Sequence, residues 1–145
     1  MRRLLSGTDL LRVRILDTAI EAELNRRLSP LGLTYVQGTL LGLLDREGTD
    51  ETSQITVEKW LGLSRPTVAG ILRRLEAKSL VEVTPSTRDR RRHLVLITPE
   101  GRRLAHEVSR TVTALGDRVL RGFSPEEEAT LTALLERATH NLVEH

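Results

Sequence analysis

The basic side chains of this 145-residue chain are concentrated in one segment, from Arg65 to Arg92. The segment holds eight basic residues against three acidic ones, a local charge of +5, whereas the whole chain carries +2 and the remainder therefore −3. The basic residues are Arg65, Arg73, Arg74, Lys78, Arg88, Arg90, Arg91 and Arg92. Guanidinium groups gathered in this way neutralise phosphates, so we expect the segment to contact nucleic acid. A basic face that contacts only solvent is the alternative interpretation.

The other residue types that could do chemistry form no catalytic or metal-binding pattern. The chain has no cysteine, which excludes disulfides, thiolate metal sites and thiol catalysis. The four histidines have no spacing that would make a two-histidine metal face or activate a nucleophile; they are His93, His106, His140 and His145. We therefore expect a protein that is not an enzyme and that holds no metal or cofactor.

Two predicted helices and a hairpin position the basic segment. Ser53 can cap a helix that ends at Gly62, and Ser64 can cap a second helix that runs to about Lys78 and has Pro66 in its first turn. The apolar face of this second helix is formed by Val68, Ile71, Leu72 and Leu75. Residues 80–83 and 94–97 are predicted strands, and the polar loop between them carries the remaining arginines. This order is typical of a winged helix-turn-helix, whose second helix enters the major groove of DNA.

The rest of the chain is predicted to be helical, which gives six helices in all. Helices are expected over 8–28, over 34–46 with a capping box from Thr34 and Gln37, from Pro99 onward, and after Ser124. Only three residues are aromatic, so the core must be built from aliphatic side chains, and the fold is mainly α with a small β-hairpin wing.

We expect one domain over residues 1–145, with a DNA-binding lobe over about 34–98 and a dimerisation layer over about 8–28 and 99–143. The apolar stripes of the terminal helices exceed what one core of this size can bury, which predicts a homodimer. No apolar run reaches the ~18 residues of a membrane span, and Met1 to Ser6 do not begin a long apolar signal segment. The protein is therefore expected to be cytoplasmic, without a membrane partner.

Five short motifs follow one another through the winged segment: Leu61-Gly62-Leu63-Ser64, Leu75-Glu76-Ala77-Lys78, Leu80-Val81-Glu82, Asp89-Arg90-Arg91 and Leu96-Ile97-Thr98-Pro99-Glu100-Gly101. Together they resemble the core of the MarR (multiple-antibiotic-resistance-type) family of transcriptional regulators. The wing of that family usually reads Asp-x-Arg-Asp-x-Arg; here Ser86 replaces the first aspartate, whereas Arg88, Asp89 and Arg91 match. Ser79 stands where the family's recognition helix usually ends in glycine, and Gly70 stands where a polar or basic residue is common.

The predicted recognition helix carries the candidate contacts to bases. The candidates are Ser64, Arg65, Pro66, Thr67, Ala69, Gly70, Arg73 and Arg74. Arg65, Thr67 and Ala69 come early enough to approach base edges, where arginine can contact guanine with two donors and alanine can contact a thymine methyl. Arg73 and Arg74 are expected to bind phosphates. Gly70 either permits a close backbone approach to DNA or is a neutral glycine, which is the commoner case.

The wing carries a second set of candidates, Arg88, Asp89, Arg90, Arg91 and Arg92. Arg91 is the best candidate for insertion into a narrow minor groove. Asp89 would be unfavourable beside DNA unless it orients an arginine through a charge-assisted pair. The other three arginines are expected to contact phosphates or to steer association, and for any one of them a non-contacting surface role remains an alternative.

The resemblance also implies a dimer that binds double-stranded DNA, most often as a repressor released by a small aromatic or phenolic acid. The effector pocket would lie between the dimerisation layer and the DNA-binding lobe. Conceivable lining residues are Arg14, Tyr35, Gln37 and His106, each of which could instead be an ordinary packing or surface residue. The alternatives are a winged-helix DNA-binding protein without a ligand, and a helical protein-interaction module that does not bind DNA.

Overall fold

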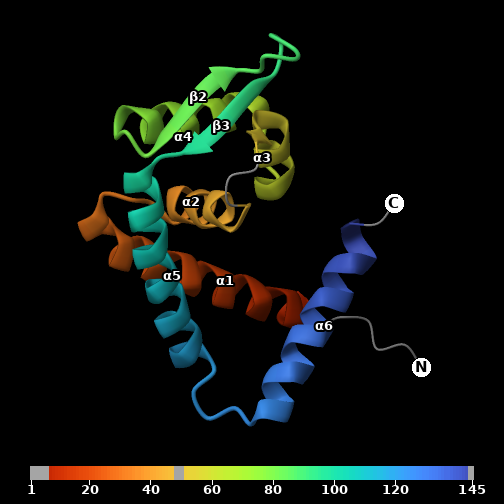
Figure 1. Cartoon of the computed structure of the whole chain (residues 1–145). Coiled ribbons are helices and arrows are strands. Elements are labelled where there is room, and N and C mark those ends of the chain that lie inside the picture. The colour runs from red at the N-terminus through yellow and green to blue at the C-terminus, as the bar shows by residue number, and fades with distance from the viewer. Residues whose placement is uncertain (1–6, 48–50, 144–145) are drawn as a thin grey trace. The chain divides into compact units, whose positions relative to one another are not determined.

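The computed structural model describes residues 7–47 and 51–143, and within them it confirms the six helices and the hairpin (Figure 1). The helices are α1 (Gly7–Leu28), α2 (Tyr35–Glu47), α3 (Gln54–Leu61), α4 (Arg65–Ala77), α5 (Pro99–Val119) and α6 (Pro125–Val143), with a 3-10 turn, η1 (Ser29–Leu31), between the first two. The strands are β1 (Thr52–Ser53), β2 (Val81–Pro85) and β3 (His93–Ile97). None of the described helices is long and apolar enough to cross a membrane.

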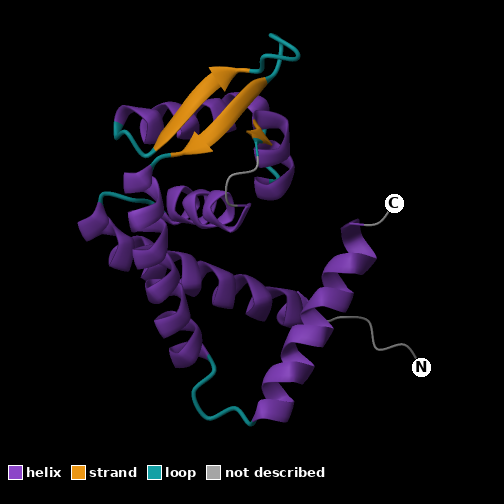
Figure 2. Ribbon diagram, viewed as in Figure 1, coloured by secondary structure: helices purple, strands orange, loops and turns teal. Residues whose placement is uncertain are grey.

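The hairpin belongs to a three-stranded antiparallel sheet, which corrects the prediction of two strands (Figure 2). The strand order is β1-β3-β2, so β3 lies in the middle, with Val95 paired to Val83 on one side and to Thr52 on the other. The additional strand, β1, is two residues long and has no periodicity to detect. It nevertheless ties the start of α3 to the base of the hairpin.

The predicted caps begin the helices where expected. Ser53 and Ser64 accept hydrogen bonds from the backbone N–H of Thr56 and Thr67, and so start α3 and α4. Gly62, with a φ of 63°, ends α3 in the left-handed conformation that favours glycine. The turn between α3 and α4 is thus set by local sequence.

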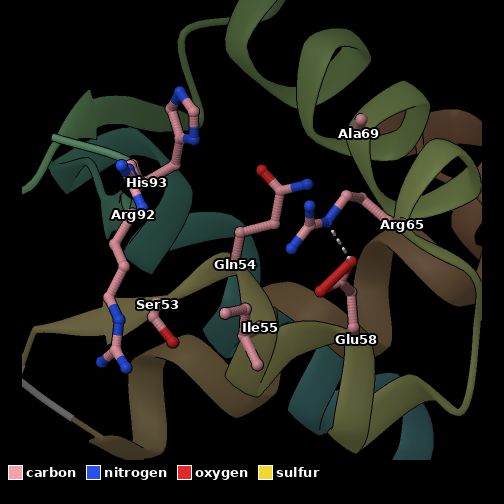
Figure 3. A pocket seen from close by; sticks show the side chains of 9 residues that line it. Ser53, Gln54, Ile55, Glu58, Arg65, Ala69, Arg92 and His93 are labelled. Atoms are coloured by element: carbon pink, nitrogen blue, oxygen red, sulfur yellow. Dashed lines mark ion pairs between the residues drawn. The ribbon is translucent and has the colours of Figure 1, made fainter. Parts of the chain in front are cut away.

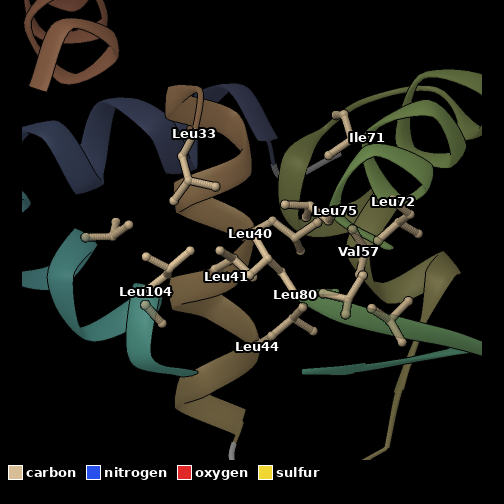
Figure 4. Packing of buried hydrophobic residues seen from close by; sticks show 14 of the residues in the cluster. Leu33, Leu40, Leu41, Leu44, Val57, Ile71, Leu72, Leu75, Leu80 and Leu104 are labelled. Carbon is tan, nitrogen blue, oxygen red and sulfur yellow. The ribbon is translucent and has the colours of Figure 1, made fainter. Parts of the chain in front are cut away.

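The core surrounds α2, whose Leu40 and Leu41 are completely buried (Figure 4). Around them pack the apolar faces of α3 and α4, the start of β2 and the first half of α5, through residues that include Val57, Leu72, Leu75, Leu80 and Leu104. Trp60 is half-buried against this cluster, as expected for a residue at the edge of the core. The buried face of α4 leaves its opposite face free for a partner.

The structure divides into two compact units, residues up to Val112 and residues from Thr113, which are described separately. In the first unit, α1 buries Leu24 and Leu28 but leaves Leu10, Val13 and Leu16 exposed. The second unit contains the end of α5 and α6, which begins with a capping box of Ser124 and Glu127. The assignment of the whole chain to one domain stays a prediction.

Candidate DNA interface

The exposed face of α4 carries the residues that the sequence singled out for contacts to bases. Burial of Val68, Ile71, Leu72 and Leu75 turns this opposite face to solvent. Ser64, Arg65, Pro66, Thr67, Arg73 and Arg74 are exposed, whereas Ala69 and Gly70 are half-buried. A Cβ added at Gly70 would meet nothing closer than the Arg73 guanidinium at 3.9 Å, so packing within the chain does not require glycine there.

The wing, defined as β2, β3 and the loop 86–92, is organised by hydrogen bonds within that loop. Ser86 is buried, its N–H donates to the carbonyl of Arg92 at 2.8 Å, and its hydroxyl accepts from the N–H of Arg88 at 3.2 Å. Serine therefore keeps a side-chain acceptor at the position where the family pattern has aspartate. This closes the base of the loop and leaves its four arginines exposed.

Asp89 holds the tip of the wing through two different contacts. One carboxylate oxygen accepts the backbone N–H of Arg91 at 3.0 Å, and the other lies 4.0 Å from Nε of Arg92. The carboxylate thus shapes the turn before Arg91, and the guanidinium nearest to it belongs to Arg92. An exposed ion pair at this distance contributes little to stability, so the bond to the backbone of Arg91 is the stronger constraint.

The recognition helix and the wing border a common concave surface of about 340 Å³, here called the wing groove (Figure 3). Its lining residues are Ser53, Gln54, Ile55, Glu58, Arg65, Ala69, Arg91, Arg92 and His93. The structure therefore brings together Arg65 and Ala69 of α4 with Arg91 and Arg92 of the wing, as a DNA interface requires. Sequence reasoning did not assign Gln54, Ile55, Glu58 and His93 to this surface, because nothing local shows that β1 and α3 meet β3.

A second cavity, also of about 340 Å³, lies at the base of the wing. Arg88, Asp89 and Arg92 border it together with Ser53 and Thr56 from the start of α3. Ser53 and Arg92 line both cavities, so the two hollows meet at the start of α3 and share one wing arginine. Cationic side chains therefore face both sides of the first turn of α3.

One acidic residue of the basic segment has a structural role. Glu76, in the last turn of α4, accepts the backbone N–H of Val83 on β2 at 3.0 Å. Its carboxylate joins the recognition helix to the first strand of the wing. The relative positions of α4 and the wing are thus fixed by a charge-assisted hydrogen bond as well as by the core.

The four candidate effector residues lie apart from both cavities. Arg14 is exposed on α1, and His106 of α5 places Nε2 3.3 Å from a carboxylate oxygen of Asp45 on α2. Tyr35 is half-buried, and its backbone N–H donates to Asn25. Gln37 is buried, and its side-chain oxygen accepts from the N–H of Thr34, which completes the predicted capping box. Nothing in these positions tests an effector role.

No cluster of three or more metal-ligating side chains occurs among residues 7–47 and 51–143.

Known proteins share this architecture. Residues 31–92 match the family model of the MarR family. The chain is similar to BpsR of Bordetella bronchiseptica, with 26% identity over 96% of this chain and 98% of that one and a TM-score of 0.82. It is similar to S. aureus MepR in its DNA-binding conformation, with 25% identity, 91% and 96% coverage and a TM-score of 0.81. For the reduced form of MarR from E. coli the values are 25% identity, 94% and 98% coverage and a TM-score of 0.77. The recognition helix, the wing and these matches agree: residues 31–92 match the MarR family, and the chain has the winged-helix fold of the MarR-family regulators to which it is similar.

Proposed function

We propose that this regulator is a repressor that binds an inverted-repeat DNA operator as a homodimer. One observation carries the proposal: Arg65 and Ala69 of α4 border the same groove as two wing arginines, Arg91 and Arg92. A recognition helix reads base edges in the major groove, while a wing arginine at its side can reach the backbone or the minor groove. The DNA-binding conformation of MepR, at 25% identity, supports the same use of this fold.

Exposed apolar side chains on α1 support the dimer. Leu10, Leu11, Val13, Ile15 and Leu16 are each between 45% and 60% exposed in the single chain. Several large apolar side chains exposed on one helix are unusual for a monomer and are typical of an interface. We therefore assign α1 to the dimer contact.

Sedimentation and footprinting test the dimer and its operator. Two-fold symmetry requires two half-sites, whose centres are about one helical turn, roughly 10 bp, or a multiple of it apart. We expect a dimer in sedimentation and two protected half-sites in inverted orientation on DNA upstream of the gene. A monomer at all concentrations, or protection of a single half-site, would contradict the proposal.

Two substitutions at Asp89 test the role of the wing tip. Asp89→Ala removes both the negative charge and the acceptor for the N–H of Arg91, so we expect weaker operator binding. Asp89→Asn removes the charge but keeps an acceptor oxygen, so binding should be equal to wild type or tighter. If Asp89→Ala binds more tightly than wild type, repulsion is the main effect of Asp89 and the turn is unimportant.

Three arginine substitutions separate specificity from affinity. Arg65→Ala should reduce preference at one base position per half-site, by about 1–3 kcal/mol for a lost bidentate contact. Arg91→Ala should cost more affinity than Arg92→Ala, which should weaken all duplexes alike and lower the salt dependence by about one unit. Titrations against operator and scrambled duplex at two salt concentrations measure all three effects. If Arg65→Ala loses affinity equally for operator and for scrambled duplex, the assignment of Arg65 to a base contact is refuted.

We further propose a small aromatic acid as the effector. The DNA binding of BpsR is regulated by 6-hydroxynicotinic acid, and this chain is 26% identical to BpsR. An effector must bind the DNA-free state more tightly than the DNA-bound state in order to release the operator. Footprinting and thermal-shift measurements with a panel of aromatic acids test this. If no acid in the panel releases the operator, a regulator that acts without a ligand is favoured.

A protein-interaction module is the alternative from another class. The exposed wing arginines argue against it, because they provide phosphate contacts that such a module does not need. A gel shift with random duplex at low salt distinguishes the two. Binding that weakens steeply with salt supports the DNA-binding function, and no binding at low salt supports the interaction module.

A further inference from the structure

We infer that Glu58 is a positioning residue that aims the Arg65 guanidinium at a base and so sets part of the operator preference. The inference rests on the proposed function, since it concerns Arg65, an arginine of the wing groove. Oε1 of Glu58 lies 3.4 Å from Nε of Arg65, across the turn from α3 to α4 (Figure 3). The Glu58 side chain is 15% exposed, whereas that of Arg65 is 73% exposed. The carboxylate is therefore fixed by packing, while the guanidinium extends into the groove.

Both residues are unfavourable for the helices that carry them. Glu58 begins the last turn of α3, where the helix dipole favours cations, and Arg65 is the first residue of α4, where it favours anions. A carboxylate that borders a DNA-binding groove also repels phosphates. An ion pair whose arginine is 73% exposed gives little stability in return. The charge of Glu58 is thus better explained by what it does to Arg65.

The atoms that form the pair leave the recognition end of Arg65 available. A guanidinium has five N–H donors in one plane, and the Glu58 carboxylate lies beside its Nε edge. The two terminal nitrogens remain free to donate to O6 and N7 of a guanine. Arg65 is thereby restricted before DNA arrives, which lowers the conformational entropy lost on binding.

Repulsion and positioning predict changes in two different quantities when Glu58 loses its charge. Removing a negative charge beside DNA should strengthen binding to every duplex if repulsion is its only effect. If Glu58 positions Arg65, the same change should lower the preference for the correct base. Affinity for unrelated DNA and preference between bases must therefore be measured separately.

The experiment begins with an operator selected by the wild-type dimer from a pool of random duplexes. Binding is then measured to this operator, to versions in which each guanine of the half-site is replaced, and to unrelated duplex. Glu58→Gln should lower the preference at one guanine position by about 5-fold or more. Its affinity for unrelated duplex should be unchanged or higher. Glu82→Gln is the matched control, because Glu82 is exposed on β2, lies outside the groove lining, and loses the same charge.

Two further variants show whether the effect passes through Arg65. Glu58→Asp keeps the charge but withdraws the carboxylate by one methylene, so it should lower the preference without raising affinity for unrelated duplex. In an Arg65→Ala background, Glu58→Gln should cause no additional loss of preference. Thermal melting of each variant verifies that it is folded.

The outcomes separate this inference from the proposed function. A wild-type protein that does not discriminate among duplexes overturns both. Discrimination by wild type that Glu58→Gln and Glu58→Asp retain overturns the inference alone. The inference is also overturned if Glu82→Gln lowers the base preference as much as Glu58→Gln does. It is likewise overturned if Glu58→Gln still lowers the preference in the Arg65→Ala background.

Discussion

Gly101, in the first turn of α5, should not tolerate a methyl group. A Cβ at this position would overlap the carbonyl oxygen of Leu80 and come within 2.8 Å of Cγ1 of Ile97. The overlapping atom cannot easily move, because the Leu80 carbonyl accepts the N–H of Thr98 at 3.1 Å and the Leu80 N–H donates to Leu75 at 3.0 Å. Gly101→Ala must therefore shift α5 away from the start of β2.

The expected loss follows from two opposing terms. An added carbon in a well-packed site costs about 1–3 kcal/mol, and a backbone obstacle favours the upper part of that range. Alanine gains up to about 1 kcal/mol over glycine in a helix. The free energy of unfolding should therefore fall by about 2 kcal/mol. For a chain of this size, this lowers the melting temperature by roughly 7 °C.

Gly42→Ala is the matched control for this measurement. Gly42 lies within α2, and a Cβ there would meet no atom within 4 Å, so only the gain in helix propensity applies. We expect this variant to be more stable than wild type by up to about 1 kcal/mol. Thermal melting and urea denaturation should be performed at one protein concentration, since the stability of a dimer depends on it. If the free energy of unfolding of Gly101→Ala equals that of Gly42→Ala, the packing argument is refuted.

Three further substitutions give separate tests. Ser79, at the end of α4, has a φ of 59°, so Ser79→Gly should raise the free energy of unfolding by about 0.5–1 kcal/mol in urea denaturation; no gain would mean that the backbone is unstrained. The Lys78 ammonium donates to the carbonyl of Gly32 and to Gln37, so Lys78→Met should cost about 1 kcal/mol and speed amide hydrogen exchange at residues 32–37, and unchanged exchange would refute this link. Hydrogen bonds from Arg26 and Arg27 lower the pKa of Glu23 from 4.5 to about 2, so its stabilising effect is present above pH 4.5 and is lost toward pH 2. In that window the stability of wild type should therefore fall more steeply than that of Glu23→Gln, and parallel pH curves would contradict the assignment.

The sequence predicts those parts of the fold that depend on neighbouring residues. Ser53, Ser64 and Thr98 are hydroxyl residues that can accept the N–H groups at the start of a helix, and each caps a helix in the structure. Gly62 provides the left-handed residue between α3 and α4. Because these signals extend over three or four residues, the helix-turn-helix was predictable without tertiary information.

Contacts between distant segments were not predictable in the same way. Strand β1 exists because Thr52 pairs with Val95, and two residues carry no pattern of their own. The pair of Glu58 and Arg65 depends on the angle between two helices rather than on a helical spacing. The sequence indicated that Asp89 should contact an arginine, but whether the contact is to a side chain or to the backbone is decided by the fold of the loop.

The end of the recognition helix shows how a departure from the family pattern is accommodated. Ser79 adopts a left-handed φ at a position where glycine would be unstrained. Its carbonyl accepts a hydrogen bond at 2.7 Å from the hydroxyl of Thr98, and the same hydroxyl accepts the N–H of Gly101. Thr98 thus caps α5 and holds the backbone after α4, while the missing Cβ of Gly101 allows the close approach. Because these contacts connect the last residues of α4 directly to the first turn of α5, a displacement of α5 should move the end of the recognition helix with it.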